Sequence, residues 1–103
     1  MPTREELYDE ADKLKDAGNL DEAVARLNEA VAMDPMYALA HSALAVVLTR
    51  LKRHDEAIVH AQKVCELEPN EAFSFTALSV ACQRAGRILD AENAMAHARL
   101  LQG

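Results

Sequence analysis

Apolar residues recur every three or four positions through most of this chain, and short polar segments separate the apolar stretches. Residues 4–16 form the first stretch, which is followed by Gly18, and residues 20–33 form the second, which is followed by Pro35. Apolar spacing of this kind is typical of amphipathic helices, and glycine and proline commonly stand just beyond helix ends. The alternation of apolar and polar residues that marks a strand is almost absent. The pattern therefore predicts an all-α protein.

The same pattern returns after 34 residues. The segment LDEAV at 20–24 is matched by HDEAI at 54–58 and by ILDAE at 88–92, and the pair DP at 34–35 is matched by EP at 68–69. We interpret the chain as three copies of one unit, each of which is a helix, a tight turn and an antiparallel helix. The units span residues 4–37, 38–71 and 72–103 of a single domain, residues 1–103.

Side chains that suit helix starts stand where helices are expected to begin. Thr3 followed by Glu6 has the spacing of a capping box at the start of the first helix. Asn19 and Asn70 stand just before the second and fifth predicted helices, and asparagine is a preferred N-cap residue. We therefore expect side-chain caps at all three places.

The tight turn within each unit is expected to use a left-handed residue. Gly18 and Gly86 follow the first helices of the first and third units, and glycine in this conformation commonly ends a helix. Lys52 holds the same position in the second unit. A lysine that keeps this turn geometry costs about 1 kcal/mol relative to glycine.

The composition is acidic, with a formal net charge of -6 and a sequence pI near 5.1. Binding to a phosphate backbone needs a basic face, so we expect no nucleic-acid partner. No apolar run approaches the ~20 residues that span a bilayer, and no apolar segment follows the N-terminus, so we expect no membrane partner and a cytoplasmic location. Cys65 and Cys82 are expected to be buried free thiols.

A repeated helical unit of this length resembles the tetratricopeptide repeat. The small residue in the first helix of that family falls on Ala11, Ala45 and Ser79, the alanine of the second helix on Ala23, Ala57 and Ala91, and the closing proline on Pro35 and Pro69. All three units match in one register over nearly the whole chain. The resemblance implies an α-solenoid of six antiparallel helices wound as a right-handed superhelix, and a non-catalytic protein that binds other proteins.

The resemblance also implies a concave groove, lined by the first helix of each unit, that takes an extended peptide or a partner helix. Carried over by position, its residues are Tyr8, Asp12, Leu39, Ala43, Val46, Arg50, Phe73, Ala77, Val80 and Arg84. This surface is acidic at one end and apolar in the middle, with the two arginines along one rim, and it suits a ligand whose apolar anchors are flanked by charge. The alternative is that Leu39 and Phe73 simply pack between adjacent units.

Some tetratricopeptide proteins bind the carboxylate of a chaperone C-terminus with lysine, asparagine and arginine at particular groove positions. In this sequence these positions hold Tyr8, Asp12, Ala43, Phe73 and Ala77. A carboxylate would meet Asp12 rather than a hydrogen-bond donor, so the charges disfavour that class of ligand.

Polar residues stand at both ends of the array. Glu10 replaces the leucine of the later units, and Glu92 and Arg99 replace apolar residues of the earlier ones. Terminal units of a repeat array need a polar outer face, so we expect three repeats to form the complete array.

The last helix carries a second apolar stripe. Leu89 and Leu100, with Ala96 between them, form this stripe, and the positions of the two leucines hold Asp21, Ala32, Asp55 and Glu66 in the earlier units. An exposed apolar stripe indicates self-association, and a homodimer formed through this helix is the alternative to an adaptor.

Patterns that would indicate catalysis or metal binding are missing. No two histidines stand at i, i+4 spacing, and we expect all four to be exposed or at helix ends. The carboxylate pairs at 21–22 and 55–56 recur at helix starts, where the helix dipole explains them. We therefore expect no enzymatic activity, no metal and no cofactor. The function we expect is that of an adaptor that binds a protein or peptide ligand in the groove.

Overall fold

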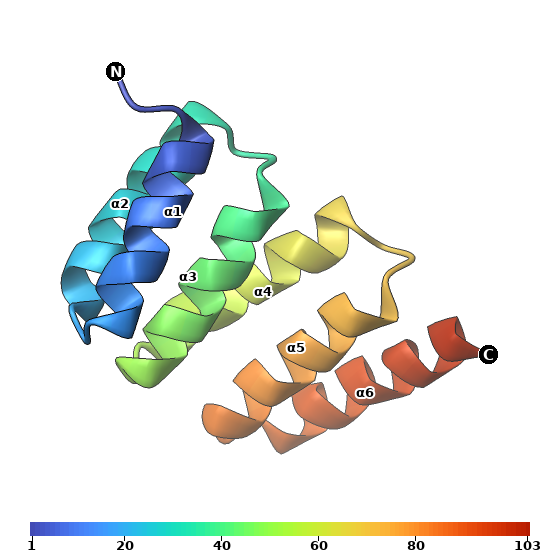
Figure 1. Ribbon diagram of the computed structural model, residues 1–103. Helices are drawn as coiled ribbons and strands as arrows, with labels where there is room; N and C mark the ends of the chain where they lie inside the picture. Colours follow the sequence, from blue (N-terminus) through green and yellow to red (C-terminus); the bar gives the residue numbers. More distant parts are fainter.

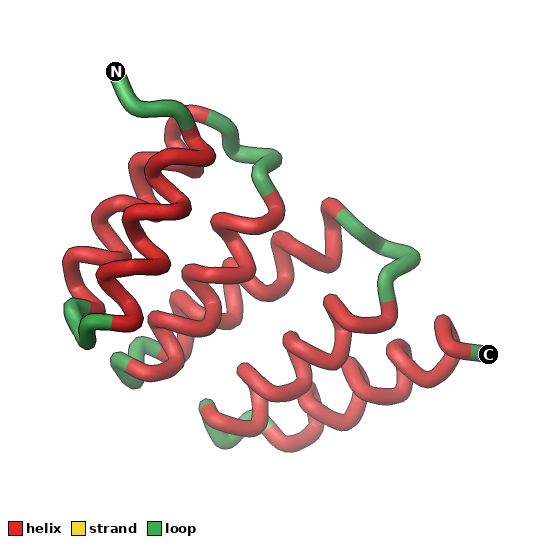
Figure 2. Tube along the Cα trace, viewed as in Figure 1, coloured by secondary structure: helices red, strands yellow, loops and turns green.

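The computed structural model describes residues 1–103, which form six α-helices and no strand. The helices are α1 (Arg4–Asp16), α2 (Leu20–Met33), α3 (Ala38–Arg50), α4 (His54–Leu67), α5 (Ala72–Arg84) and α6 (Ile88–Gln102) (Figure 1). Only short loops connect them, as the tube view shows (Figure 2). The prediction of an all-α protein is confirmed.

Consecutive helices pair as three hairpins, α1 with α2, α3 with α4 and α5 with α6. Contacts of α2 with α3 and of α4 with α5 join neighbouring hairpins, so that the hairpins follow one another in chain order (Figure 1). The first hairpin does not pack against the third, and the molecule is elongated, with extents of 42 × 25 × 19 Å. This arrangement is a helical-repeat solenoid, as predicted.

Helix starts differ in how their free N–H groups are satisfied. At α1 the predicted capping box is confirmed, since the Glu6 N–H donates to Thr3 Oγ1 and the Thr3 N–H donates to the Glu6 carboxylate, each at 3.1 Å. Asn19 stands at the N-cap of α2, but its side chain makes no capping hydrogen bond, because its ψ of 69° departs from the extended backbone that directs the Thr3 side chain to its helix. The cap expected at Asn70 is wrong, since the N-cap of α5 is Glu71.

The turn within each hairpin keeps one geometry with or without glycine. Gly18, Lys52 and Gly86 have φ of 84°, 62° and 79°, so the left-handed lysine is confirmed. In every turn the following residue donates its N–H to the carbonyl five residues earlier at 2.8 Å, as Arg53 does to Leu48. This hydrogen bond belongs to the Schellman motif, which satisfies a free carbonyl at the helix end and reverses the chain.

Small residues allow the helices of a hairpin to cross closely. Ala23, Ala57 and Ala91, which hold the family's alanine position in the second helices, are 0%, 0% and 2% exposed. Leu27 of α2 and Leu44 of α3 are fully buried in a core that the first two units share. Because the core fixes how far apart successive hairpins stand, it also sets the spacing of α1, α3 and α5.

Two histidines form a hydrogen bond within the second hairpin, which corrects the expectation that all four are exposed or at helix ends. His41 is 7% exposed, and its Nδ1 lies 2.9 Å from His60 Nδ1. His41 Nε2 donates to the Pro35 carbonyl at 2.8 Å, because a carbonyl can only accept. The Nδ1 of neutral His41 must then accept a hydrogen bond from His60 Nδ1.

Candidate peptide-binding groove

Two parallel helices expose an apolar ridge on the same side of the solenoid. On α3, Leu39 and Val46 are 55% and 53% exposed, and on α5, Phe73 and Val80 are 79% and 43% exposed. Each pair is seven residues apart and therefore lies on one face of its helix, two turns apart. The alternative that Leu39 and Phe73 pack between the units is wrong, because both side chains face solvent.

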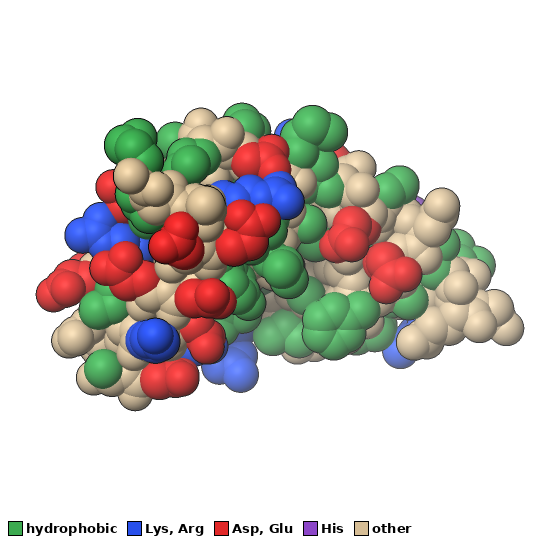
Figure 3. All heavy atoms as spheres, turned by 45° about the horizontal axis from the view of Figure 1, so that its top comes forward, with side chains coloured by type: hydrophobic (Ala, Val, Ile, Leu, Met, Phe, Trp, Pro, Cys, Tyr) green, Lys and Arg blue, Asp and Glu red, His purple; other side chains and the backbone are tan.

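The space between these ridges is a groove of about 600 Å³. Its walls are α3 and α5, and Ala61 and Val64 of α4 lie at its base. In the space-filling view, apolar side chains gather in a hollow beside the acidic N-terminal part of the molecule (Figure 3). We call this space the α3/α5 groove, and it has the size and apolar lining that ligand sites commonly have.

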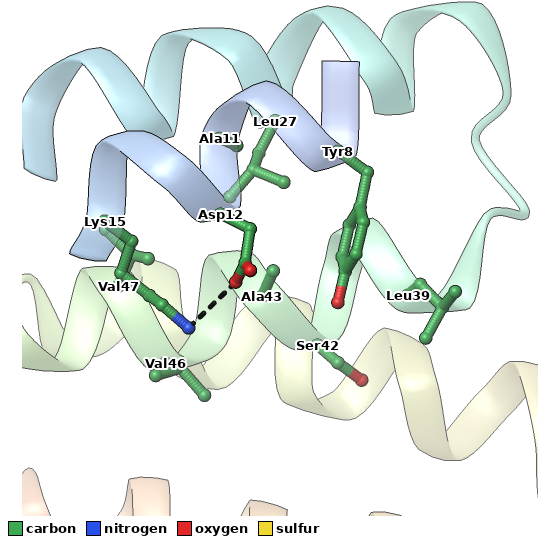
Figure 4. A pocket seen from close by; sticks show the side chains of 10 residues that line it. All are labelled: Tyr8, Ala11, Asp12, Lys15, Leu27, Leu39, Ser42, Ala43, Val46 and Val47. Atoms are coloured by element: carbon green, nitrogen blue, oxygen red, sulfur yellow. Dashed lines mark ion pairs between the residues drawn. The ribbon is translucent and has the colours of Figure 1, made fainter. Parts of the chain in front are cut away.

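A smaller recess of about 190 Å³ lies between α1 and α3. The Tyr8 side chain extends from α1 toward α3, and the Lys15 amine makes a 3.1 Å ion pair with Asp12 beside it (Figure 4). Leu39 and Val46 line both the recess and the α3/α5 groove. Helix α3 is therefore a ridge between two adjoining cavities on one surface.

All ten residues predicted for the groove line one cavity or the other. The recess brings together Tyr8, Asp12, Leu39, Ala43 and Val46, and the α3/α5 groove brings together Leu39, Val46, Arg50, Phe73, Ala77, Val80 and Arg84. That these residues bind a ligand stays a prediction.

Three charged residues that line these cavities were missed from the sequence. Lys15 borders the recess, and Glu68 and Glu71 border the α3/α5 groove. They were missed because the groove was assigned only from selected positions of the first helices, whereas Glu68 and Glu71 belong to the loop between α4 and α5. The Glu71 N–H donates to the Glu68 carbonyl at 3.2 Å, and the turn holds both residues at this edge. The acidic residues around Pro69 were the available signal.

Charges of opposite sign occupy the two ends of the α3/α5 groove. Arg50 and Arg84 are the last residues of α3 and α5, and both line the groove without an ion pair. Glu68 and Glu71 lie beside the start of α5 and are equally unpaired. A ligand in this groove would therefore meet positive charge at one end and negative charge at the other.

The potential metal ligands and the cysteines of the protein can be compared with what a reactive site needs. Groups of three or more His, Cys, Asp or Glu side chains that could hold a metal ion are not found. Both cysteines are buried free thiols, as predicted. Burial, with smaller contributions from Cys82 and Glu66, raises the pKa of Cys65 to about 11, and burial also raises the pKa of Cys82. Thiols with raised pKa values are poor nucleophiles at neutral pH.

The other surface residues singled out in the sequence lie outside the groove. Leu89 and Leu100 are 76% and 81% exposed, and Ala96 between them is exposed as well. Glu92 and Arg99 are exposed at the same end of the solenoid, and Glu10 at the other end accepts a hydrogen bond from Arg26 at 3.2 Å. The homodimer and the completeness of the array stay predictions. No helix of the protein has the length and apolar character needed to cross a membrane.

Six helices in stacked hairpins, with a groove along the first helix of each, define a helical-repeat protein. A tetratricopeptide repeat profile matches residues 8–72. The chain belongs to the tetratricopeptide repeat family, which is generally a non-catalytic module for protein interactions. No curated protein matches the chain.

Solved structures share the fold at low sequence identity. A crystal structure of MamA superposes with a TM-score of 0.89 at 21% identity, over 97% of this chain and 58% of MamA. A structure of MamA from Desulfovibrio magneticus RS-1 gives a TM-score of 0.84 at 22% identity, over 95% of this chain and 55% of that one. The second repeat domain of Spaghetti (RPAP3), bound to the HSP90 peptide SRMEEVD, gives 0.85 at 17% identity, over 96% and 92%. This chain thus spans little more than half the length of the MamA structures.

Proposed function

We propose that the protein is an adaptor that binds a peptide or helix of a partner protein in the α3/α5 groove and the adjoining recess. One observation carries the proposal: Leu39, Val46, Phe73 and Val80 are left exposed along a single groove of about 600 Å³. Soluble proteins rarely expose clustered apolar side chains that have no binding role. These four side chains would be the apolar anchors, and the proposed activity is binding without catalysis.

The ligand we propose differs from the acidic peptide bound by the RPAP3 domain. Asp12 in the recess stands where a carboxylate clamp would need a donor, and the whole chain has a net charge of -6. Asp12 already holds the Lys15 amine at 3.1 Å, so a terminal carboxylate would have to compete with Asp12 for this cation. We therefore propose a ligand recognised first by its apolar side chains. We also propose a cytoplasmic location, which suits two free thiols, and no nucleic-acid partner.

Charge introduced into the groove tests the proposal. Val46→Glu combined with Val80→Glu should abolish partner capture, because each substitution puts a carboxylate on an apolar ridge that the ligand must cover. Wild type and variant would be compared by affinity purification from cells that express the protein, and circular dichroism would report helicity. Both substituted side chains are exposed, so the fold should persist.

A matched control carries the same added charge outside the groove. Met33 and Val59 are 53% and 60% exposed and line none of the cavities, so Met33→Glu with Val59→Glu should keep the partner. If the groove variant captures the same partner as wild type, the adaptor proposal is wrong. If both variants lose it, net charge and not the groove determines binding.

A second candidate function is assembly through α6. The exposed stripe of Leu89, Ala96 and Leu100 lies away from the groove, so that self-association would leave the groove open. We propose this homodimer as the alternative function.

A further inference from the structure

The α3/α5 groove carries unpaired charge at both ends. Two arginines near it are neutralised, since Arg53 pairs with Glu56 at 2.7 Å and Arg87 pairs with Asp55 at 3.2 Å. Arg50 and Arg84, by contrast, have no carboxylate partner in a chain of 17 acidic and 11 basic residues. Two unpaired guanidinium groups at one end of an apolar groove are available to a ligand's carboxylates.

The spacing of the apolar anchors suits a helical ligand. Leu39 and Val46 are seven residues apart on α3, as are Phe73 and Val80 on α5, which corresponds to about 10.5 Å along each wall. Two turns of an α-helix span nearly the same length, about 10.8 Å. A helix laid between the walls with apolar residues at i, i+3, i+4 and i+7 would therefore meet both ends of each ridge.

The charges also define the direction of such a helix. Helices favour acidic residues in their first turn and basic residues in their last turn, because of the helix dipole. An acidic first turn fits Arg50 and Arg84, which are at the C-terminal ends of α3 and α5, and a basic last turn fits Glu68 and Glu71 at the opposite end. The bound helix then runs antiparallel to α3 and α5. In this orientation the positive end of each helix dipole lies beside the negative end of its neighbour, and the dipoles attract.

We propose that the α3/α5 groove binds an amphipathic helix of another protein, antiparallel to α3 and α5, with acidic residues in its first turn at Arg50 and Arg84 and basic residues in its last turn at Glu68 and Glu71. This proposal rests on the proposed function, because it names the ligand class and orientation for the same groove. It differs from the chaperone-peptide mode in using Arg50 and Arg84 and in placing no carboxylate at Asp12.

A displayed peptide library tests the ligand class directly. The library consists of helical peptides of about 14 residues with a fixed apolar face at i, i+3, i+4 and i+7, and with charged and neutral residues randomised in the first and last turns. Selection on the wild-type protein should enrich Asp and Glu in the first turn and Lys and Arg in the last. Selection on the variant Arg50→Glu with Arg84→Glu should enrich basic residues in the first turn instead.

Affinities of one selected peptide complete the test. Binding should weaken about tenfold or more in the variant Arg50→Glu with Arg84→Glu, since two attractive contacts become repulsive. The control Lys13→Glu with Arg99→Glu reverses two exposed, unpaired cations outside both groove cavities and should change affinity by less than about threefold. Equal weakening in both variants would mean that only net charge acts, and the proposal would be overturned.

The possible outcomes separate this inference from the proposed function. Peptides that lose binding with Val46→Glu and Val80→Glu but have no charge preference in either turn would support the adaptor and overturn the antiparallel helix. Peptides with the opposite polarity, basic first and acidic last, would overturn the direction. If no peptide is enriched, or if enriched peptides bind the valine variant equally well, the helix inference fails, and the adaptor function is then decided by partner capture with Val46→Glu and Val80→Glu.

Discussion

Lys52 is a single residue whose backbone conformation opposes stability. It adopts a φ of 62° in a turn that uses glycine in the other two hairpins, and this conformation costs a residue with a Cβ about 1–2 kcal/mol. We expect Lys52→Gly to raise the free energy of unfolding in urea by about 1 kcal/mol, after the larger entropy loss of glycine is subtracted. Lys52→Ala, which keeps the Cβ, should change it by less than about 0.5 kcal/mol. An equal gain in both variants would assign the effect to the lysine side chain.

The histidine pair makes stability depend on pH. Burial, together with the neighbouring His41, lowers the pKa of His60 below its ordinary value of 6.5, and Glu56 offsets part of this shift. Below about pH 6.5 the unfolded chain therefore binds more protons at this residue than the folded protein does. The contribution of His60 to stability is complete above the unfolded pKa and declines as pH falls toward the folded pKa. We expect the urea midpoint to drop between pH 7 and pH 5.

His60→Asn is the control for the histidine pair, because an asparagine amide can donate to His41 and does not titrate. The variant should have a flatter dependence of the urea midpoint on pH, and an unchanged slope would show that other groups determine it. The pair itself could not be predicted from the sequence. Its members are 19 residues apart on different helices, and only the packing of α3 on α4 brings them together.

The close crossing of the two helices within a hairpin depends on small side chains. Ala57 is 0% exposed where α4 crosses α3, so that additional carbon atoms have no space. We expect Ala57→Leu to lower the free energy of unfolding by about 1–3 kcal/mol, because overpacking forces neighbouring helices apart. Ala25→Leu on the exposed face of α2 should change it by less than about 0.5 kcal/mol. Similar losses in the two variants would mean that leucine itself, and not the crossing, is responsible.

Helix positions were predictable because the same sequence pattern occurs three times. A helix boundary that is weakly marked in one unit can therefore be placed from the same position in the other two units. The starts of α1, α3 and α5 at Arg4, Ala38 and Ala72 follow the 34-residue spacing. The side-chain caps were predicted less well. Asn19 has a suitable side chain, but the backbone leaving the Schellman turn gives it a ψ of 69°, and this geometry is set by the turn rather than by the residue.

In the assembled molecule, the helices that form the walls of the α3/α5 groove were easier to predict from the sequence than the charged residues at its ends. Leu39 and Phe73 were assignable because they occupy one repeat position on successive first helices. Glu68 and Glu71 belong to a loop, and their place beside the groove results from how the third hairpin packs on the second. The polarity on which the antiparallel helix depends is therefore a property of the assembled solenoid.

The exposed stripe on α6 is small for a dimer interface. Leu89 and Leu100 are 76% and 81% exposed, but a stable homodimer commonly buries about 800 Å² on each partner, more than two leucines provide. Self-association should therefore be weak, with a dissociation constant of about 10 μM or higher. In sedimentation equilibrium the average mass of the wild type should rise with concentration, and Leu89→Asp should remain monomeric. Val59→Asp, which charges a residue of α4 that is 60% exposed, should behave as the wild type does. A single monomer mass for the wild type at all concentrations, unchanged by Leu89→Asp, would leave the adaptor as the sole function proposed.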